Sequence, residues 1–126
     1  MAGVSAYLAD RWLDATGNAV AFSASGVWVR LHVGDPGAAG TANPAVESSR
    51  KQVSFGAASG GVIVSDADVS WVNISGSEDA TFFSAWDAAS GGNFLFSGAV
   101  VAGAYQAGDT YTISAGALSV SLTVAS

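Results

Sequence analysis

Apolar and polar side chains alternate along several short segments of this 126-residue chain. The clearest segment is residues 27–33, where valine or leucine fills every second position and Trp28, Arg30 and His32 fill the positions between them. Because successive side chains of a strand point to opposite faces, this pattern predicts a half-buried β-strand. Residues 118–124 alternate in the same way and predict a second such strand. Its inward positions are Leu118, Val120, Leu122 and Val124.

The N-terminus has a helical spacing instead. Apolar side chains recur there every three or four residues, at Val4, Leu8, Trp12 and Ala15. Ser5 is of a type that caps the start of helices and Gly17 is of a type that ends them, so we predict a helix over residues 5–16. We expect residues 1–17 to form an N-terminal helix or arm and residues 18–126 to form one β-sandwich domain.

The pentapeptide Ala-Ala-Ser-Gly-Gly occurs twice, at residues 57–61 and 88–92. Each copy lies shortly after an aromatic residue and shortly before an apolar run. Glycine reaches the positive φ that tight turns between twisted strands require, so both copies predict β-hairpins. Six segments are further candidate strands: 51–55, 62–65, 69–74, 81–87, 93–101 and 111–113. Residues 38–49 have no period and predict a surface loop, of a length often found in binding or assembly elements.

Seven or eight short antiparallel strands with frequent turn signals predict a mainly β chain, folded as a single-domain β-sandwich with one short N-terminal helix. A small β-barrel is the alternative architecture. Aromatic side chains fall on both sides of the predicted second hairpin, at Phe82, Phe83, Trp86, Phe94 and Phe96. We therefore expect a sheet covered on two faces, by a second sheet or by a partner chain.

The composition favours association and excludes several classes of function. Half of the residues are hydrophobic and only 11% are charged, against about a quarter in an average soluble domain. The net charge of −6, with four basic residues, argues against nucleic acid binding. Residues 88–108 are uncharged and long enough to span a membrane, but their five glycines and several polar side chains exclude a bilayer helix. We expect no membrane contact and a soluble protein.

Candidate chemistry is sparse. His32 is the only histidine, and Asp35 is too close to it along the chain to complete a catalytic triad, so we interpret His32 as a strand-surface or interface residue. Asp66 and Asp68 have a spacing that could chelate Ca²⁺, but they fit better as residues flanking a turn. We predict no enzyme activity, no cofactor and no metal site.

Trp28 lies on the more polar side of its predicted strand, together with Arg30 and His32. This placement favours a contact with another chain or with a ligand. The Leu8 and Trp12 face of the helix either docks on a neighbouring chain or covers the end of its own sandwich. We therefore predict partner contacts at Leu8, Trp12, Trp28, Arg30 and His32.

Several motifs in a fixed order resemble a family of small bacteriophage virion proteins. The similar segments are residues 7–13, 27–43, 50–61, 86–95, 107–111 and 118–122. The family is labelled tail-fibre or minor tail protein in phages of actinobacteria. The resemblance implies a non-enzymatic structural role in the virion, with assembly in the cytoplasm of the bacterial host and no catalytic residue to carry over.

The leading hypothesis is thus a tail-fibre or minor tail component engaged in particle assembly. Its expected partners are further copies of itself, with a trimer as the default closed ring, and another phage structural protein. One alternative is a capsid decoration protein that stabilises the head lattice. An alternative of another class is a carbohydrate-binding module that recognises a host surface glycan through exposed Trp28 or Tyr105.

Overall fold

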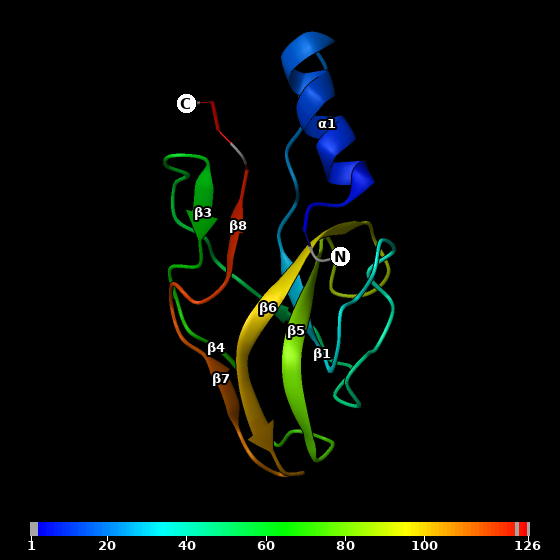
Figure 1. Ribbon diagram of the computed structural model, residues 1–126, viewed down its shortest axis with the longest axis vertical. Coiled ribbons are helices and arrows are strands. Elements are labelled where there is room, and N and C mark those ends of the chain that lie inside the picture. Colours follow the sequence, from blue (N-terminus) through cyan, green and yellow to red (C-terminus); the bar gives the residue numbers. More distant parts are fainter. Residues whose placement is uncertain (1–2, 123, 126) are drawn as a thin grey trace.

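The computed structural model of the chain describes residues 3–122, 124 and 125. Residues 1, 2, 123 and 126, the ends of the predicted arm and of the predicted sandwich domain, lie outside the described residues. Within the described part the chain forms one helix and eight strands (Figure 1). Their bounds are α1 (Ala6–Gly17), β1 (Trp28–His32), β2 (Lys51–Gln52), β3 (Val62–Val64), β4 (Val69–Trp71), β5 (Glu78–Trp86), β6 (Phe94–Tyr105), β7 (Tyr111–Ile113) and β8 (Ser119–Ser121).

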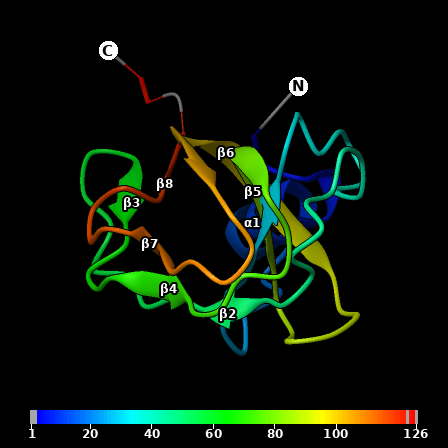
Figure 2. The same cartoon turned by 90° about the horizontal axis from the view of Figure 1, so that it is seen from below.

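The strands form two layers. One layer is a four-stranded antiparallel sheet in the order β2-β1-β5-β6. The other layer consists of the antiparallel pairs β3–β8 and β4–β7, which follow each other along the molecule (Figure 1). Figure 2 shows β4 and β7 on the side of the molecule opposite β5 and β6. The predicted small β-sandwich is confirmed, and a closed barrel does not form from the described residues.

The core lies between the two layers. Val29 of β1 is buried opposite Ala85 of β5. Leu31 is buried opposite Phe83 in the same way. Trp71 of β4 is fully buried as well. The predicted inward side of residues 27–33 is therefore confirmed for the two positions at its centre.

The outer face of the four-stranded sheet is covered by the chain itself. Residues 33–50 fold back along β1, with the Val33 amide donating to the carbonyl of Asn43 at 2.9 Å. Gly40 lies against the Phe94 ring so closely that a Cβ atom there would come within 2.5 Å of it. The predicted cover on both faces is thus present, and its two parts are the second layer and this loop.

The helix begins where the sequence predicts. The Ser5 hydroxyl accepts from the Leu8 amide at 3.1 Å and donates to the carbonyl of Phe94 at 2.6 Å. The Ser5 amide also donates to the carbonyl of Leu95 at 2.8 Å, and residues 3–5 pair antiparallel with the start of β6. Because Ser5 both caps α1 and pairs with β6, it fixes the start of the helix to the sheet.

Both predicted hairpins form. The first copy of the pentapeptide (residues 57–61) turns the chain between residue 55 and β3, where Ser59 pairs with Val62. The second copy (residues 88–92) connects β5 to β6, where Trp86 pairs with Phe94. The repeated tract is therefore a turn element in both places.

The end of the chain differs from the prediction. Leu118 is fully buried, but Leu122 is 50% exposed and Val124 is 57% exposed. The inward orientation predicted for these two side chains is wrong. The strand β8 ends at residue 121, and Leu122 faces a cleft instead of a packed core.

Candidate interaction surface

His32 is buried between β1 and the loop that folds back over it. Its Nδ1 lies 2.8 Å from the carbonyl oxygen of Ala42, so Nδ1 carries the proton and donates it. Its Nε2 accepts from the Ser84 hydroxyl at 2.7 Å. The Ser84 oxygen in turn accepts from the indole N–H of Trp86 at 2.8 Å. Burial lowers the pKa of His32, so the ring is neutral at neutral pH.

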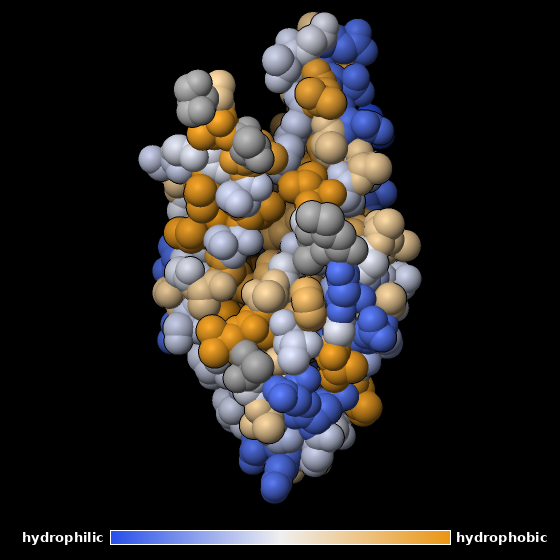
Figure 3. All heavy atoms as spheres, viewed as in Figure 1, coloured by the Kyte–Doolittle hydropathy of each residue, from blue (hydrophilic) through white to orange (hydrophobic). Residues whose placement is uncertain are grey.

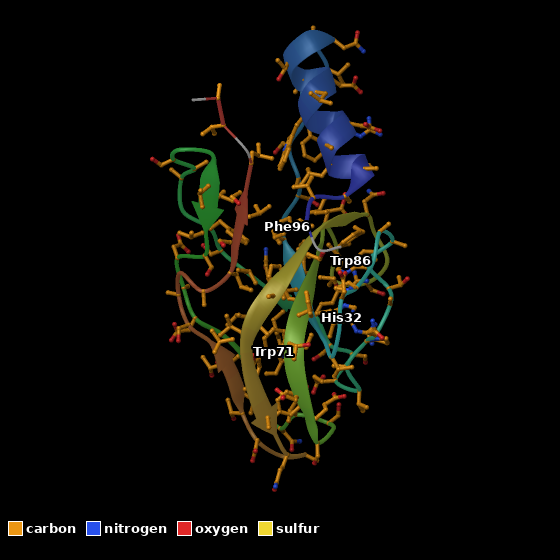
Figure 4. The ribbon with its side chains drawn as sticks, viewed as in Figure 1. His32, Trp71, Trp86 and Phe96 are labelled. Atoms are coloured by element: carbon orange, nitrogen blue, oxygen red, sulfur yellow. The ribbon has the colours of Figure 1, made fainter. Side chains whose placement is uncertain are left out.

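A histidine beside a serine hydroxyl is an arrangement that nucleophilic catalysis uses. Here Ser84 has no exposed surface, and the group that orients the ring is a backbone carbonyl. A substrate cannot reach this hydroxyl, so the pair holds the loop against β5. Figure 4 shows His32 and Trp86 on the side of the sheet that faces the loop, away from Trp71.

Of the two predicted settings of His32, the strand surface is therefore wrong, and an interface role of this residue stays a prediction. His32 is only 1% exposed, because the residues that follow β1 return along its polar side. The alternation of residues 27–33 identifies which side chains share a face, but it does not show that a later part of the chain covers that face.

Trp28 and Arg30 are half-buried on the same face. The Trp28 ring lies directly on Gly26, where a Cβ atom would come within 2.7 Å of it. The Arg30 guanidinium donates to the carbonyl of Ala45 at 3.3 Å, and its Nε is buried without a partner among the described residues. Tyr105, the other side chain expected to stack on a sugar, is 6% exposed.

The two predicted contacts on α1 lie in different surroundings. Leu8 is 4% exposed and belongs to the core, so its own sandwich covers it. Trp12 is half-buried, one turn further along the helix, and faces a cleft. The structure therefore brings Trp12 to a surface that another chain can reach.

An apolar cleft of about 510 Å³ separates α1 from the β3–β8 pair. It is lined by Trp12, Ala15, Thr16, Ala58, Gly61, Val62, Ile63, Val120 and Leu122. A smaller hollow of about 160 Å³ continues from it toward the core and shares Trp12, Ile63 and Val120. Figure 3 shows apolar side chains gathered around this part of the molecule.

No charged side chain is among the described residues that line the cleft. Val62 on its wall is 38% exposed, and Leu122 is 50% exposed. Apolar surface gains about 25 cal/mol for each Å² that is removed from water. The cleft can therefore bind apolar side chains, and it offers no group for acid–base chemistry.

The acidic side chains serve mainly to tie loops together. The Glu47 carboxylate accepts hydrogen bonds from the amides and hydroxyls of Ser49 and Ser75. Burial alone would raise the pKa of Glu47, but these four bonds hold it below its usual range. Asp68 is exposed and accepts from the Ala115 amide at 2.8 Å.

Within the described residues, no group of three or more potential ligands comes together around a metal position. Nor does the described part contain a helix with the length and apolar character needed to cross a bilayer.

Comparison with models of known protein families places the chain in a family. The model of a family described as podophage GP4 fiber I protein gp80 matches residues 3–121, from the arm that pairs with β6 to the end of β8. The chain belongs to this phage fibre family. A search of curated proteins found no match. Membership of the podophage fibre family confirms the resemblance to phage virion proteins at the level of a fibre protein.

Sequence reasoning missed most of the side chains that line the cleft. It placed two partner contacts on α1, of which Trp12 lines the cleft, and three on β1, whereas the rest of the cleft lining of this fibre protein comes mainly from residues in and around β3 and β8. One signal was available: residues 52–65 and 110–126 contain no charged side chain. These two uncharged stretches form the β3–β8 pair.

Proposed function

We propose that the chain is a non-enzymatic structural subunit of a phage tail fibre, and that the apolar cleft between α1 and β3–β8 attaches it to another protein of the particle. Membership of the fibre family supports the structural role. The cleft, with its uncharged lining and its exposed valine and leucine side chains, supports attachment through apolar contacts.

The dimensions of the cleft indicate the kind of segment that it accepts. A space of about 510 Å³ holds a few apolar side chains of a partner. Trp12 forms part of one wall, and tryptophan is enriched among the residues that dominate binding energy at interfaces. We infer that the occupant is a loop or extended segment whose apolar side chains enter beside Trp12.

An enzymatic role has no comparable support. The histidine and serine that lie within hydrogen-bonding distance are both buried. The part of the cleft lining that the structure describes has no titratable side chain. The geometry therefore favours a protein that binds its neighbours and does not transform them.

A charge placed in the cleft tests the proposal. Val62→Lys adds an ammonium group, and binding of the partner segment would strip this group of water at a cost of several kcal/mol. Each loss of about 1.4 kcal/mol in binding free energy lowers the affinity tenfold. We expect particles made with this variant to contain at least tenfold less of the protein than wild-type particles, as measured by mass spectrometry of purified virions.

The matched control is Val72→Lys. Val72 is 71% exposed and does not line the cleft, so this variant adds the same charge at a different surface. We expect its incorporation to equal that of the wild type, with both variants folded by circular dichroism. Normal incorporation of Val62→Lys would contradict attachment through the cleft, and absence of the wild-type chain from virions would contradict the structural role itself.

A further inference from the structure

Three of the four basic residues of the chain lie at one edge of the four-stranded sheet. Arg30 is in β1, Lys51 begins β2 and Arg50 precedes it. Val29 lies opposite Lys51 in the pairing of these strands, so one position further along this register Arg50 falls opposite Arg30. Side chains at opposite positions of antiparallel strands share a face. The two guanidinium groups therefore lie on the same side of the sheet.

Arg50 is held in place on the outer side of the sheet. Its Nη1 donates to the carbonyls of Ala88 and Gly91, at 2.8 and 2.7 Å. Its guanidinium also lies over the ring of Trp86, which Figure 4 labels, 4.5 Å from the centroid. The remaining donors of this side chain, Nε and Nη2, make no hydrogen bond within the described part of the chain, and neither is buried.

Arg30 has weaker contacts. Its Nη2 donates to the carbonyl of Ala45 at 3.3 Å, which is long for a hydrogen bond. Its Nε is buried and has no partner among the described residues. Its Nη1 is not buried and makes no bond to them either, so a donor of this guanidinium is open to a ligand.

The charge of the two arginines is poorly compensated. Burial lowers the pKa of Arg50, and the charge of Arg30 lowers it further. Asp87 acts on Arg50 in the opposite direction, but both oxygens of its carboxylate accept hydrogen bonds from Asn93. The chain has ten acidic residues, yet the hydrogen bonds that the described residues make with the two guanidinium groups all come from backbone carbonyls. Like charges opposite each other destabilise a sheet, so this arrangement favours an added anion.

We propose that Arg30 and Arg50 together bind one oxyanion, a carboxylate or phosphate group of a ligand. Such a group accepts several hydrogen bonds at once, and guanidinium groups donate to it in a fixed planar geometry. The anion would offset the repulsion between the two charges. Arg50 is already held by its other contacts, so it loses little side-chain freedom on binding. Neither arginine lines the apolar cleft, so the site does not depend on the proposed attachment.

NMR of the purified full chain tests the proposal, with inorganic phosphate as the probe. The chain has three arginines, so each side-chain Nε–H signal can be followed separately. Arg11 is the internal control, because its guanidinium also lies over an aromatic ring, that of Tyr7, but on α1. We expect the Arg30 and Arg50 signals to shift together and to saturate at millimolar phosphate, at constant ionic strength. The Arg11 signal should stay nearly unchanged.

A parallel titration with acetate distinguishes the two ligand classes. Tighter binding of phosphate assigns a phosphate group to the site, and tighter binding of acetate assigns a carboxylate.

Removal of one charge gives a second test. Arg30→Gln keeps a polar side chain but removes one of the two charged donors. We expect this variant to bind phosphate about tenfold more weakly, as measured from the Arg50 signal. Arg11→Gln makes the same change on the helix and should leave the affinity unchanged. Circular dichroism shows whether each variant is folded, and the comparison of signals in the wild type decides the question even if Arg30→Gln does not fold.

Two results would overturn the proposal. The first is that neither phosphate nor acetate shifts the Arg30 and Arg50 signals more than the Arg11 signal. The second is that a folded Arg30→Gln variant binds phosphate as tightly as the wild type. Neither result bears on the incorporation of the protein into virions, so the cleft is tested independently.

Discussion

The two copies of Ala-Ala-Ser-Gly-Gly share a backbone conformation at their glycines but close differently. Gly60 and Gly61 of the first copy have φ of 61° and 81°, and Gly91 and Gly92 of the second have 65° and 75°. All four lie in the left-handed region that glycine adopts without strain. The pentapeptide thus gives the same local bend twice. The residues around it determine whether the bend closes as a tight hairpin or as a wider loop.

The first copy closes as a tight hairpin. Ser59 and Val62 exchange two backbone hydrogen bonds, at 2.9 and 3.1 Å, around the two glycines. Positive φ at both central residues is the signature of the two-residue turn that best matches the twist of paired strands. These hydrogen bonds join backbone groups, and the turn ends at the wall of the apolar cleft.

The second copy closes as a wider loop, held by one backbone hydrogen bond from the Asp87 amide to the Asn93 carbonyl at 3.2 Å and by several side-chain bonds. The Asp87 carboxylate accepts from the amide of Asn93 at 2.7 Å and from its side-chain Nδ2 at 3.0 Å. The Arg50 guanidinium donates to the carbonyls of Ala88 and Gly91, at 2.8 and 2.7 Å. It also stacks over the ring of Trp86, 4.5 Å from the centroid.

Two neighbouring residues account for the difference. Asp87 takes the place before the second copy that Gly56 takes before the first. Asn93 follows the second copy, whereas Val62 follows the first. A carboxylate and an amide can bond across the loop, and a glycine and a valine cannot. The same five residues therefore give a turn closed by backbone bonds in an apolar setting, and a loop closed mainly by side chains in a polar one.

Removal of the carboxylate should have the largest effect on this comparison. Asp87→Ala breaks two charge-assisted hydrogen bonds, and we expect the free energy of unfolding to fall by about 2–3 kcal/mol in urea denaturation. Gly56→Ala is the matched change beside the first copy. A Cβ atom at Gly56 meets nothing within 4 Å, so we expect a change within about 0.5 kcal/mol. Equal losses in the two variants would show that Asp87 does not close the loop.

Loss of the guanidinium should have a smaller effect. Arg50→Gln removes the two bonds to the second copy and the stacking on Trp86, and we expect a loss of about 1.5 kcal/mol, measured in the same way. Lys51→Gln removes one positive charge from the adjacent position and should change the free energy of unfolding by less than about 0.5 kcal/mol. If both variants lose the same free energy of unfolding, the change in net charge causes the loss and the loop contacts do not.

The shared glycine conformation predicts equal, modest effects in the two copies. Gly60 and Gly91 have nearly the same φ, and a Cβ atom at either meets nothing within 4 Å. We expect Gly60→Ala and Gly91→Ala each to lower the free energy of unfolding by about 1 kcal/mol, because alanine is strained in the left-handed region. Asparagine at either position should cost less. Unequal alanine effects would mean that the two bends are not equivalent.

Only the stability contributed by the second copy should depend on pH. This change in the free energy of unfolding is the smallest effect that we expect. Burial alone would raise the pKa of Asp87, but the bonds from Asn93 and the Arg50 charge lower it below its usual range. The folded pKa thus lies below the unfolded value of about 3.9, so the stabilisation is complete at higher pH and is lost as the pH falls through the folded pKa. The difference in unfolding free energy between the wild type and Asp87→Asn should be constant from pH 7 to about pH 5 and then shrink. A difference that does not vary with pH would exclude this carboxylate as the source.

Local signals predicted most of the fold. The cap at Ser5, the alternation in β1 and the glycine pairs of both hairpins depend on residues within a few positions of one another, and each is present in the structure. The candidate site was less predictable, because its parts come from distant segments. His32 bonds to Ser84 of β5, 52 residues away, and β3 pairs with β8 across a similar separation. No periodicity within a short window reports such pairings.

The triple role of Ser5 couples the start of α1 to the start of β6. Its hydroxyl caps α1, the same hydroxyl bonds to Phe94, and its amide pairs with Leu95. Any tilt of the helix therefore pulls on the first hydrogen bonds of β6, and any shift of β6 turns the helix. A segment that enters the cleft and displaces α1 would therefore also strain the first hydrogen bonds of β6.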